Sequence, residues 1–178
     1  IAEGLVARGK KVTVITSQHD KKLPLLEFIN GVRVIRTPVS FHIGKGVISP
    51  TFIPTVLREA KISRVVNIHA PMLEAGIITM LSPVPVVTTY QCDVSLPPSM
   101  LGRFQNMIMD YLMRLAINKS CFVTVSTDDY ANHSRLSDVL RKKMVEISPT
   151  CHLRPSGTAN FRDGVGFHVG FLGRIVEE

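Results

Sequence analysis

Residues 64–90 read RVVNIHAPMLEAGIITMLSPVPVVTTY and predict a strand, a helix and a second strand in succession. Residues 64–69 and 85–90 are rich in β-branched residues, as strands are. Pro71 suits the first position of a helix, and residues 72–81 are almost all apolar, as in a buried helix. Two strands joined by a helix run parallel and take a right-handed crossover, so this stretch favours an α/β sheet.

The same alternation continues on both sides of this unit. Further strands are expected at residues 11–17, 31–39, 121–126 and 144–147, and further helices at residues 51–62, 99–118 and 126–140. Repeated strand–helix–strand units predict an α/β fold with a doubly wound, mostly parallel, Rossmann-like sheet and helices on both faces. In such sheets, ligands bind beyond the carboxyl ends of the strands.

Three of these elements carry more specific expectations. Residues 31–39 alternate apolar and basic residues before Pro38, so we expect a half-exposed strand near a sheet edge. Ser126-Thr-Asp-Asp129 has the S-x-x-D form that caps a following helix. The helix over 99–118 is expected to be amphipathic, because apolar residues recur at helical spacing at Leu101, Phe104, Ile108, Leu112 and Leu115.

The composition is that of a globular chain, with 45% hydrophobic and 20% charged residues. The three cysteines lie far apart and form no C-x-x-C pair, which favours reduced cysteines in a cytoplasmic protein. The six histidines show no H-E-x-x-H or similar spacing, so no metal site is expected. No apolar run approaches the roughly 20 residues of a membrane-spanning helix.

The net charge of +7 favours an anionic partner: a phosphorylated substrate, an anionic membrane surface or a nucleic acid. Aromatic residues do not interleave with the basic ones, and the chain has no Trp. Because a stacking platform is therefore not expected, nucleic acid is not an expected partner. A solvated basic surface is the alternative interpretation.

A glycine-rich stretch from His42 to Ser49 is the first candidate for ligand binding. Gly44 and Gly46 allow the backbone to approach a ligand, and Lys45 between them supplies a mobile positive charge. The stretch lacks the spacing of a P-loop. It predicts a phosphate or sugar contact, with a flexible surface loop as the alternative.

Two further candidates follow neighbouring strands of the expected sheet. His69 lies at the end of a strand, where a binding role and a structural role are both open. Gln91 and Asp93 come after the next strand and suit sugar hydroxyls, because an amide donates and accepts while an ionised carboxylate accepts. A turn is the alternative for this pair. Ser126, after a later strand, is interpreted as a helix cap rather than a nucleophile.

Both ends of the chain suggest interior segments of a longer protein. Residues 1–9 predict the last turns of a helix that ends at Gly9. Residues 169–172 predict a short strand, followed directly by Gly173 and Arg174. A Gly-Arg pair after a strand suits a phosphate, because glycine lets the backbone approach and arginine supplies a forked donor.

The ordered set of segments resembles the family 4 retaining glycosyltransferases of the GT-B fold. Six segments carry the resemblance: residues 5–17, 31–34, 66–71, 88–93, 123–130 and 170–174. The resemblance implies two facing Rossmann-like domains, of which the first binds the acceptor and the second a nucleotide-sugar donor. It places the acceptor domain at residues 1–150, a linker at 151–168 and the start of the donor domain at 169–178.

The resemblance also implies an activity. Family members transfer a hexose from a UDP- or GDP-sugar to a lipid or saccharide acceptor, with retained anomeric configuration and without a bound metal ion or other cofactor. Many act in cell-envelope synthesis, so a cytoplasmic location, at the inner face of a membrane for some members, is implied. The fragment alone is expected to be inactive, because half of the cleft lies in the second domain.

Individual residues take their implied roles from the same resemblance. Gly44, Lys45 and Gly46 resemble an acceptor-contacting loop, and His69 and Asp93 fall at acceptor-side positions. Gly173 and Arg174 resemble the contact to the donor diphosphate. The residue after Tyr90 is commonly His in the family and is Gln91 here, which can bond a hydroxyl but cannot shuttle a proton near neutral pH.

Two alternatives stay open at the level of sequence. The chain could be a non-catalytic Rossmann-like binding module derived from a transferase, and Gln91 is the residue that speaks for it. A dinucleotide-dependent oxidoreductase would need a G-x-G-x-x-G loop before residue 1.

Overall fold

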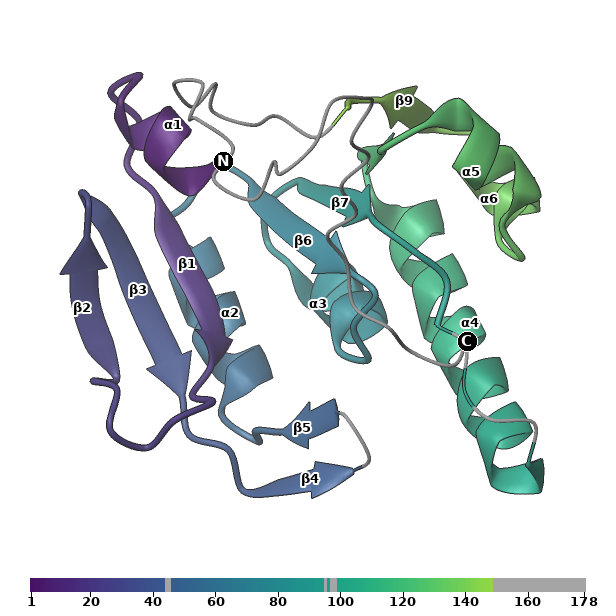
Figure 1. Ribbon diagram of the computed structural model, residues 1–178. Helices are drawn as coiled ribbons and strands as arrows, with labels where there is room; N and C mark the ends of the chain where they lie inside the picture. Colours follow the sequence, from purple (N-terminus) through teal and green to yellow (C-terminus); the bar gives the residue numbers. More distant parts are fainter. Residues whose placement is uncertain (44–45, 95, 97–98, 149–178) are drawn as a thin grey trace, which may run out of the picture. The chain divides into compact units, whose positions relative to one another are not determined.

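A computed structural model describes residues 1–43, 46–94, 96 and 99–148 of the chain (Figure 1). The helices and strands follow in the order α1 (Ala2–Val6), β1 (Thr13–Ser17), β2 (Leu26–Ile29), β3 (Val32–Thr37), β4 (Phe41–Ile43), β5 (Gly46–Ile48), α2 (Phe52–Ala60), β6 (Val66–Ala70), α3 (Ala75–Leu81), β7 (Val86–Tyr90), α4 (Met100–Lys119), β8 (Phe122–Val125), α5 (Asp128–His133), α6 (Ser137–Leu140) and β9 (Met144–Glu146). The expectations for residues 149–178 lie outside the described residues.

The first sheet has the strand order β1-β3-β2, with β1 and β3 parallel and β2 antiparallel to β3. The prediction that residues 31–39 lie near an edge is wrong, because β2 pairs with β3 on its second side. Asn30 and Gly31 join these two strands with positive φ angles of 48° and 81°. Two positive φ values define a tight hairpin turn, which Asn-Gly favours.

Opposite charges neutralise the arginines of β3 on both faces of the strand. Arg36 is buried, pairs with Glu27 of β2 and donates to the carbonyl of Pro24 at 2.9 Å. Arg33 donates to the carboxylate of Glu59 in α2 at 2.5 Å, and Glu59 is itself buried. The alternating basic residues of this strand therefore form internal ion pairs rather than an exposed basic face.

Residues 41–43 and 46–48 form strands, where the sequence predicts a loop. Strands β4 and β5 pair antiparallel, with Phe41 opposite Ile48 and His42 opposite Val47. Gly44 and Lys45 lie outside the described residues, and Gly46 is exposed at the start of β5.

The second sheet contains the four parallel strands β6-β7-β8-β9 in that order and is flanked by helices, which confirms a Rossmann-like α/β fold. Its buried face carries residues from alternate positions of each strand, as a period of two requires. The core that this face shares with the helices includes Ile68, Val86, Tyr90, Val123, Val125, Ile78, Met113, Ile117, Leu136 and Leu140.

Helices α3 and α4 lie side by side (Figure 1). A Cβ atom added at Gly76 of α3 would lie 2.8 Å from the carbonyl oxygen of Leu112 in α4, so glycine permits this close approach. The predicted extent of α4 is confirmed, but its predicted apolar side faces solvent over the first three turns: Leu101 and Phe104 are exposed. The buried residues of α4 are Gly102, Met113, Ala116 and Ile117.

The segment after β8 differs from the single helix predicted over 126–140. It forms two short helices, α5 and α6, separated at Ser134, whose backbone is extended. Thr127, rather than Ser126, caps α5, since its side chain accepts a bond from the backbone N–H of Tyr130 at 3.2 Å. The capping principle therefore holds with a shift of one residue.

Candidate functional site

The carboxyl ends of β6, β7 and β8 meet at one edge of the parallel sheet. Ala70 lies opposite Tyr90, and Tyr90 lies opposite Val125, so the segments that follow these three strands begin at the same level. The backbone N–H of Gln91 extends the ladder by donating to the carbonyl of Ala70 at 3.1 Å. This is the edge at which ligands bind in open parallel sheets.

His69 and Gln91 come together at this edge. Nε2 of Gln91 lies 3.2 Å from Nδ1 of His69, and both residues are exposed. With Gln91 as the donor, Nδ1 is the acceptor and the neutral ring carries its proton on Nε2. The pair then offers an imidazole N–H and an amide oxygen to a ligand in solvent.

A row of polar side chains crosses the same face of the sheet. Oγ1 of Thr124 in β8 donates to Oγ1 of Thr89 in β7 at 3.0 Å, and Thr89 donates to Oδ1 of Asn67 in β6 at 3.0 Å. Because alternate residues of a strand share a face, Asn67 lies on the side of His69, and Thr89 on the side of Gln91. Hydrogen bonds therefore fix Asn67, two residues before His69, and Thr89, two residues before Gln91.

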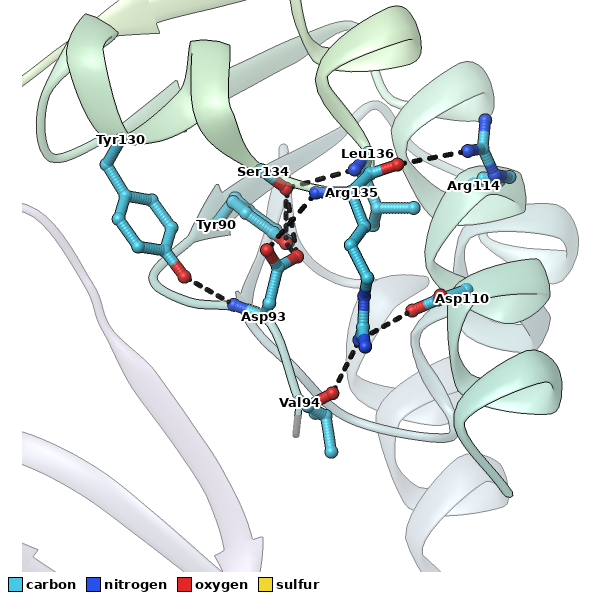
Figure 2. Close-up of polar contacts among 9 residues, drawn as sticks. All are labelled: Tyr90, Asp93, Val94, Asp110, Arg114, Tyr130, Ser134, Arg135 and Leu136. Carbon is cyan, nitrogen blue, oxygen red and sulfur yellow. Dashed lines mark hydrogen bonds and ion pairs between the residues drawn. The ribbon is translucent and has the colours of Figure 1, made fainter. Parts of the chain in front are cut away.

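Asp93 is held from three directions by groups of the protein itself (Figure 2). Its Oδ1 accepts from the hydroxyl of Tyr90 and from Oγ of Ser134, the latter at 2.9 Å. Its Oδ2 accepts from the backbone N–H of Arg135 at 3.2 Å, and its own backbone N–H donates to the hydroxyl of Tyr130 at 2.8 Å. The carboxylate thus joins the end of β7 to the connection between α5 and α6.

Tyr90 is buried in this cluster, with 2% of its surface exposed. Burial and then the hydrogen bond to Asp93 raise the pKa of its hydroxyl well above the ordinary range. The phenol therefore stays protonated at neutral pH and acts as a donor to the carboxylate.

Arg135 fixes Val94, the residue that follows Asp93. Its guanidinium donates to the carbonyl of Val94 at 2.5 Å and pairs with Asp110 of α4 at 3.2 Å (Figure 2). Arg114 in turn donates to the carbonyl of Arg135 at 3.2 Å. Residues 91–94 are therefore connected to α4 and to the α5–α6 connection by charge-assisted bonds.

The structure brings some of the expected site residues together and not others. His69 and Gln91 are in contact, and Asp93 lies two residues further on with its carboxylate bonded inside the protein. Within the described residues, no hydrogen bond joins Gly46 to His69, Gln91 or Asp93. The expectations for Gly44, Lys45, Gly173 and Arg174 fall outside the described residues.

Sequence reasoning missed the residues that position Asp93. Tyr90, Ser134 and Arg135 hold its carboxylate, and Asp110 holds Arg135. Tyr90 could have been identified from the sequence, because it ends an apolar strand and a buried hydroxyl needs a hydrogen-bond partner. Ser134 and Arg135 lie about forty residues later, and no local pattern connects them to Asp93.

The chemistry available at this edge is hydrogen bonding to hydroxyl groups. Within the described residues, no group of three or more His, Cys, Asp or Glu side chains could hold a metal ion. The amide of Gln91 neither takes up nor releases a proton near neutral pH, so its contribution is hydrogen bonding alone.

The Rossmann-like α/β fold and the polar carboxyl edge define a class of proteins that bind ligands at the ends of parallel strands. Within that class, residues 1–150 match the family model described as the glycosyl transferase 4-like domain. The match covers most of the chain, and the chain belongs to this family. No curated protein matches it.

None of the helices among residues 1–43, 46–94 and 99–148 is long and apolar enough to cross a membrane.

Proposed function

We propose that this chain is the acceptor side of a glycosyltransferase that transfers a hexose from a nucleotide-sugar to a lipid or saccharide hydroxyl with retained configuration. Membership of the glycosyl transferase 4-like family supports transfer of a sugar. The observation that carries the acceptor assignment is the contact of His69 with Gln91 at the carboxyl edge of the sheet.

His69 and Gln91 have separate roles in this proposal. Gln91 donates to Nδ1 and so sets the neutral tautomer and the direction of the imidazole ring. The N–H at Nε2 of His69 then binds the acceptor or the transferred sugar. The amide oxygen of Gln91 accepts a hydrogen bond from a hydroxyl of the acceptor or the sugar. Gln91 thus stabilises the transfer electrostatically and does not carry a proton.

Asp93 acts on this site through the backbone. Its carboxylate is bonded to Tyr90, Ser134 and Arg135, so it holds residues 91–94 in place. The proposal therefore treats Asp93 as a positioning residue next to the acceptor and not as a general base.

The donor site is proposed from the sequence alone. Gly173 and Arg174 are proposed to contact the diphosphate of a UDP- or GDP-sugar at the start of a donor-binding domain, with residues 151–168 as the linker. Gly44, Lys45 and Gly46 are proposed to contact the acceptor. No metal ion or organic cofactor enters the proposed reaction, in which Arg174 and helix dipoles stabilise the leaving diphosphate.

A transfer assay on the protein of the complete reading frame tests the proposal. Radiolabelled UDP-glucose and GDP-mannose serve as donors, and octyl glucoside, octyl mannoside and bacterial polar lipids serve as acceptors. The proposal predicts a labelled product whose anomeric configuration, read by NMR, matches the donor. Product of inverted configuration would contradict the proposal of retention.

Matched variants locate the site. His69→Ala and Gln91→Ala should each lower kcat/KM on the order of tenfold to a hundredfold, because each removes a polar contact near the reacting groups. His133→Ala is the control, since His133 is another exposed histidine, at the end of α5. Equal activity of all three variants and the wild type would contradict the assignment.

A further inference from the structure

Tyr130 is an exposed aromatic side chain beside the carboxyl edge of the parallel sheet. Helix α5 packs on the core through Ala131, which is fully buried, whereas 40% of the surface of Tyr130 is exposed. Within the described residues, the hydrophobic core does not include Tyr130. A single exposed aromatic residue is ordinary. What distinguishes Tyr130 is that both ends of its side chain are held.

The backbone of α5 holds one end of the Tyr130 side chain, and the segment after β7 holds the other. The hydroxyl accepts from the backbone N–H of Asp93 at 2.8 Å. Figure 2 shows the ring on the side of Asp93 that faces away from Asp110, with its hydroxyl directed at the backbone. A ring that is fixed in this way loses little conformational entropy when it binds a ligand.

Tyr130 lies near the His69–Gln91 pair. Its hydroxyl contacts Asp93, two residues after Gln91, and two residues of extended chain span at most about 7 Å. Nε2 of Gln91 in turn lies 3.2 Å from Nδ1 of His69. The aromatic ring and the two hydrogen-bonding side chains therefore start from backbone positions that one ligand of the size of a sugar can span.

The charges beside Tyr130 are negative. Asp128 and Asp129 precede it in the first turn of α5, and both are exposed. Glu146 at the end of β9 is exposed as well, and its carboxylate accepts from the backbone N–H of Asp128 at 3.1 Å. Carboxylates repel phosphate and accept hydrogen bonds from hydroxyl groups. This part of the edge therefore suits an uncharged ligand with several hydroxyl groups better than a nucleotide.

A sugar ring matches both kinds of group at this edge. One face of a pyranose ring carries C–H groups, which the negative face of an aromatic ring attracts. Its hydroxyl groups lie around the rim and can bond to an amide, an imidazole and carboxylates at the same time. An acyl chain would contact the aromatic ring alone, so the mixed chemistry favours a saccharide.

We propose that Tyr130 is a specificity-determining residue for a saccharide acceptor. Its ring packs against the C–H face of a hexose while His69 and Gln91 bond to the hydroxyl groups. The bond from the backbone N–H of Asp93 sets the orientation of the ring. This inference rests on the proposed function, and it narrows the acceptor to a molecule that presents a sugar ring.

Fluorine NMR of the protein of the complete reading frame, labelled with fluorotyrosine, tests the inference without a donor. The resonances of Tyr130 and Tyr111 are those that disappear in Tyr130→Phe and Tyr111→Phe. At least one of methyl glucoside and methyl mannoside should shift the Tyr130 resonance in a saturable way, and uridine monophosphate should not. Tyr111 is the matched internal control, since it is 67% exposed on α4 and should not respond.

Substitutions of Tyr130 separate the ring from the hydroxyl. In the transfer assay, Tyr130→Leu should raise the KM for octyl glucoside or octyl mannoside by about threefold to tenfold, because the packing of an aromatic ring is lost. Tyr130→Phe keeps the ring and should raise this KM less. The KM for the nucleotide-sugar should stay the same in both variants, and Tyr111→Leu should change neither constant. Thermal unfolding shows that the variants fold.

The NMR titration overturns the inference if neither glycoside shifts the Tyr130 resonance, if Tyr111 shifts as much as Tyr130, or if uridine monophosphate shifts Tyr130 more than both glycosides do. An acceptor KM that Tyr130→Leu leaves unchanged, or raises no more than Tyr130→Phe does, would contradict it as well. Because the titration needs no donor, absence of sugar transfer by the wild type would count against the proposed function alone.

Discussion

The hydroxyl of Tyr90, at the last position of β7, donates to Oδ1 of Asp93 in the segment that leads to α4. Ser134 donates to the same oxygen at 2.9 Å, and its own Oγ accepts from the backbone N–H of Leu136 at 3.0 Å. One carboxylate oxygen thus connects the end of a central strand with the start of α6. The stability and order of the candidate site depend on this connection.

Tyr90→Phe keeps the ring and removes the donor. We expect the free energy of unfolding to fall by about 1–3 kcal/mol, because Asp93 loses a buried donor. Urea denaturation measures the change. Tyr130→Phe is the control, since Tyr130 is more exposed and accepts only from the backbone N–H of Asp93, so its loss should be smaller. The reverse order of the two losses would contradict the assigned role.

The raised pKa of Tyr90 predicts a dependence of stability on alkaline pH. In the unfolded chain, tyrosine ionises near pH 10, while the folded chain retains the proton above that pH. Above about pH 10, the unfolded state therefore binds fewer protons, and stability falls with rising pH by at most about 1.4 kcal/mol per unit from this residue.

Comparison of the wild type with Tyr90→Phe between pH 9 and pH 11.5, roughly the range around an ordinary tyrosine pKa, isolates this contribution. The variant should lose stability less steeply with pH, because it lacks the group whose pKa differs between the two states. Identical slopes would show that Tyr90 ionises equally in both states.

Asp93→Asn tests the second oxygen of the carboxylate. An amide has one accepting oxygen, so it cannot accept both from the hydroxyls of Tyr90 and Ser134 and from the backbone N–H of Arg135. We expect a loss of about 1–2 kcal/mol of stability and faster hydrogen exchange at the Arg135 amide. Exchange at this amide that stays as slow as in the wild type would mean that Asp93 does not hold it.

Two glycine substitutions test the packing of α3 on α4. Gly76→Ala places a Cβ 2.8 Å from the backbone carbonyl of Leu112 and should destabilise the fold by about 1–3 kcal/mol. Gly4→Ala in α1 meets no atom within 4 Å and should stabilise by about 0.5–1 kcal/mol, as alanine does in a helix. Equal effects at the two sites would contradict the close helix contact.

Most strands were predictable because their β-branched runs are local signals. Strand β2 was missed, although Asn30-Gly31 directly after it is a strong hairpin signal. The prediction that β3 lies near a sheet edge rested on its alternating apolar and basic residues and on Pro38, and it did not foresee that β2 pairs with the second side of β3. The parallel order of β6, β7 and β8 followed correctly from the crossover rule.

The buried face of α4 was not predictable from periodicity. Leu101 and Phe104 form an apolar row at helical spacing, but so do Met113, Ala116 and Ile117 on the opposite side of the helix. The choice between the two faces depends on how closely α3 approaches, which Gly76 sets from another element.

The candidate site was predictable only in part, because some of its contacts depend on tertiary packing. Parallel strands bring their carboxyl ends together, so the approach of His69 to Gln91 follows from the fold class. The partners of Asp93 come from a later part of the chain and depend on how α5 and α6 pack. Tertiary contacts of this kind leave no local pattern in the sequence.

The most direct measurement of the central proposal is kcat/KM for sugar transfer by the complete protein and its His69→Ala, Gln91→Ala and His133→Ala variants, with each donor in turn. The proposal predicts transfer by the wild type, strong losses in the first two variants and no loss in the third. Absence of transfer from both donors, or full activity in all three variants, would contradict an acceptor site at the His69–Gln91 pair.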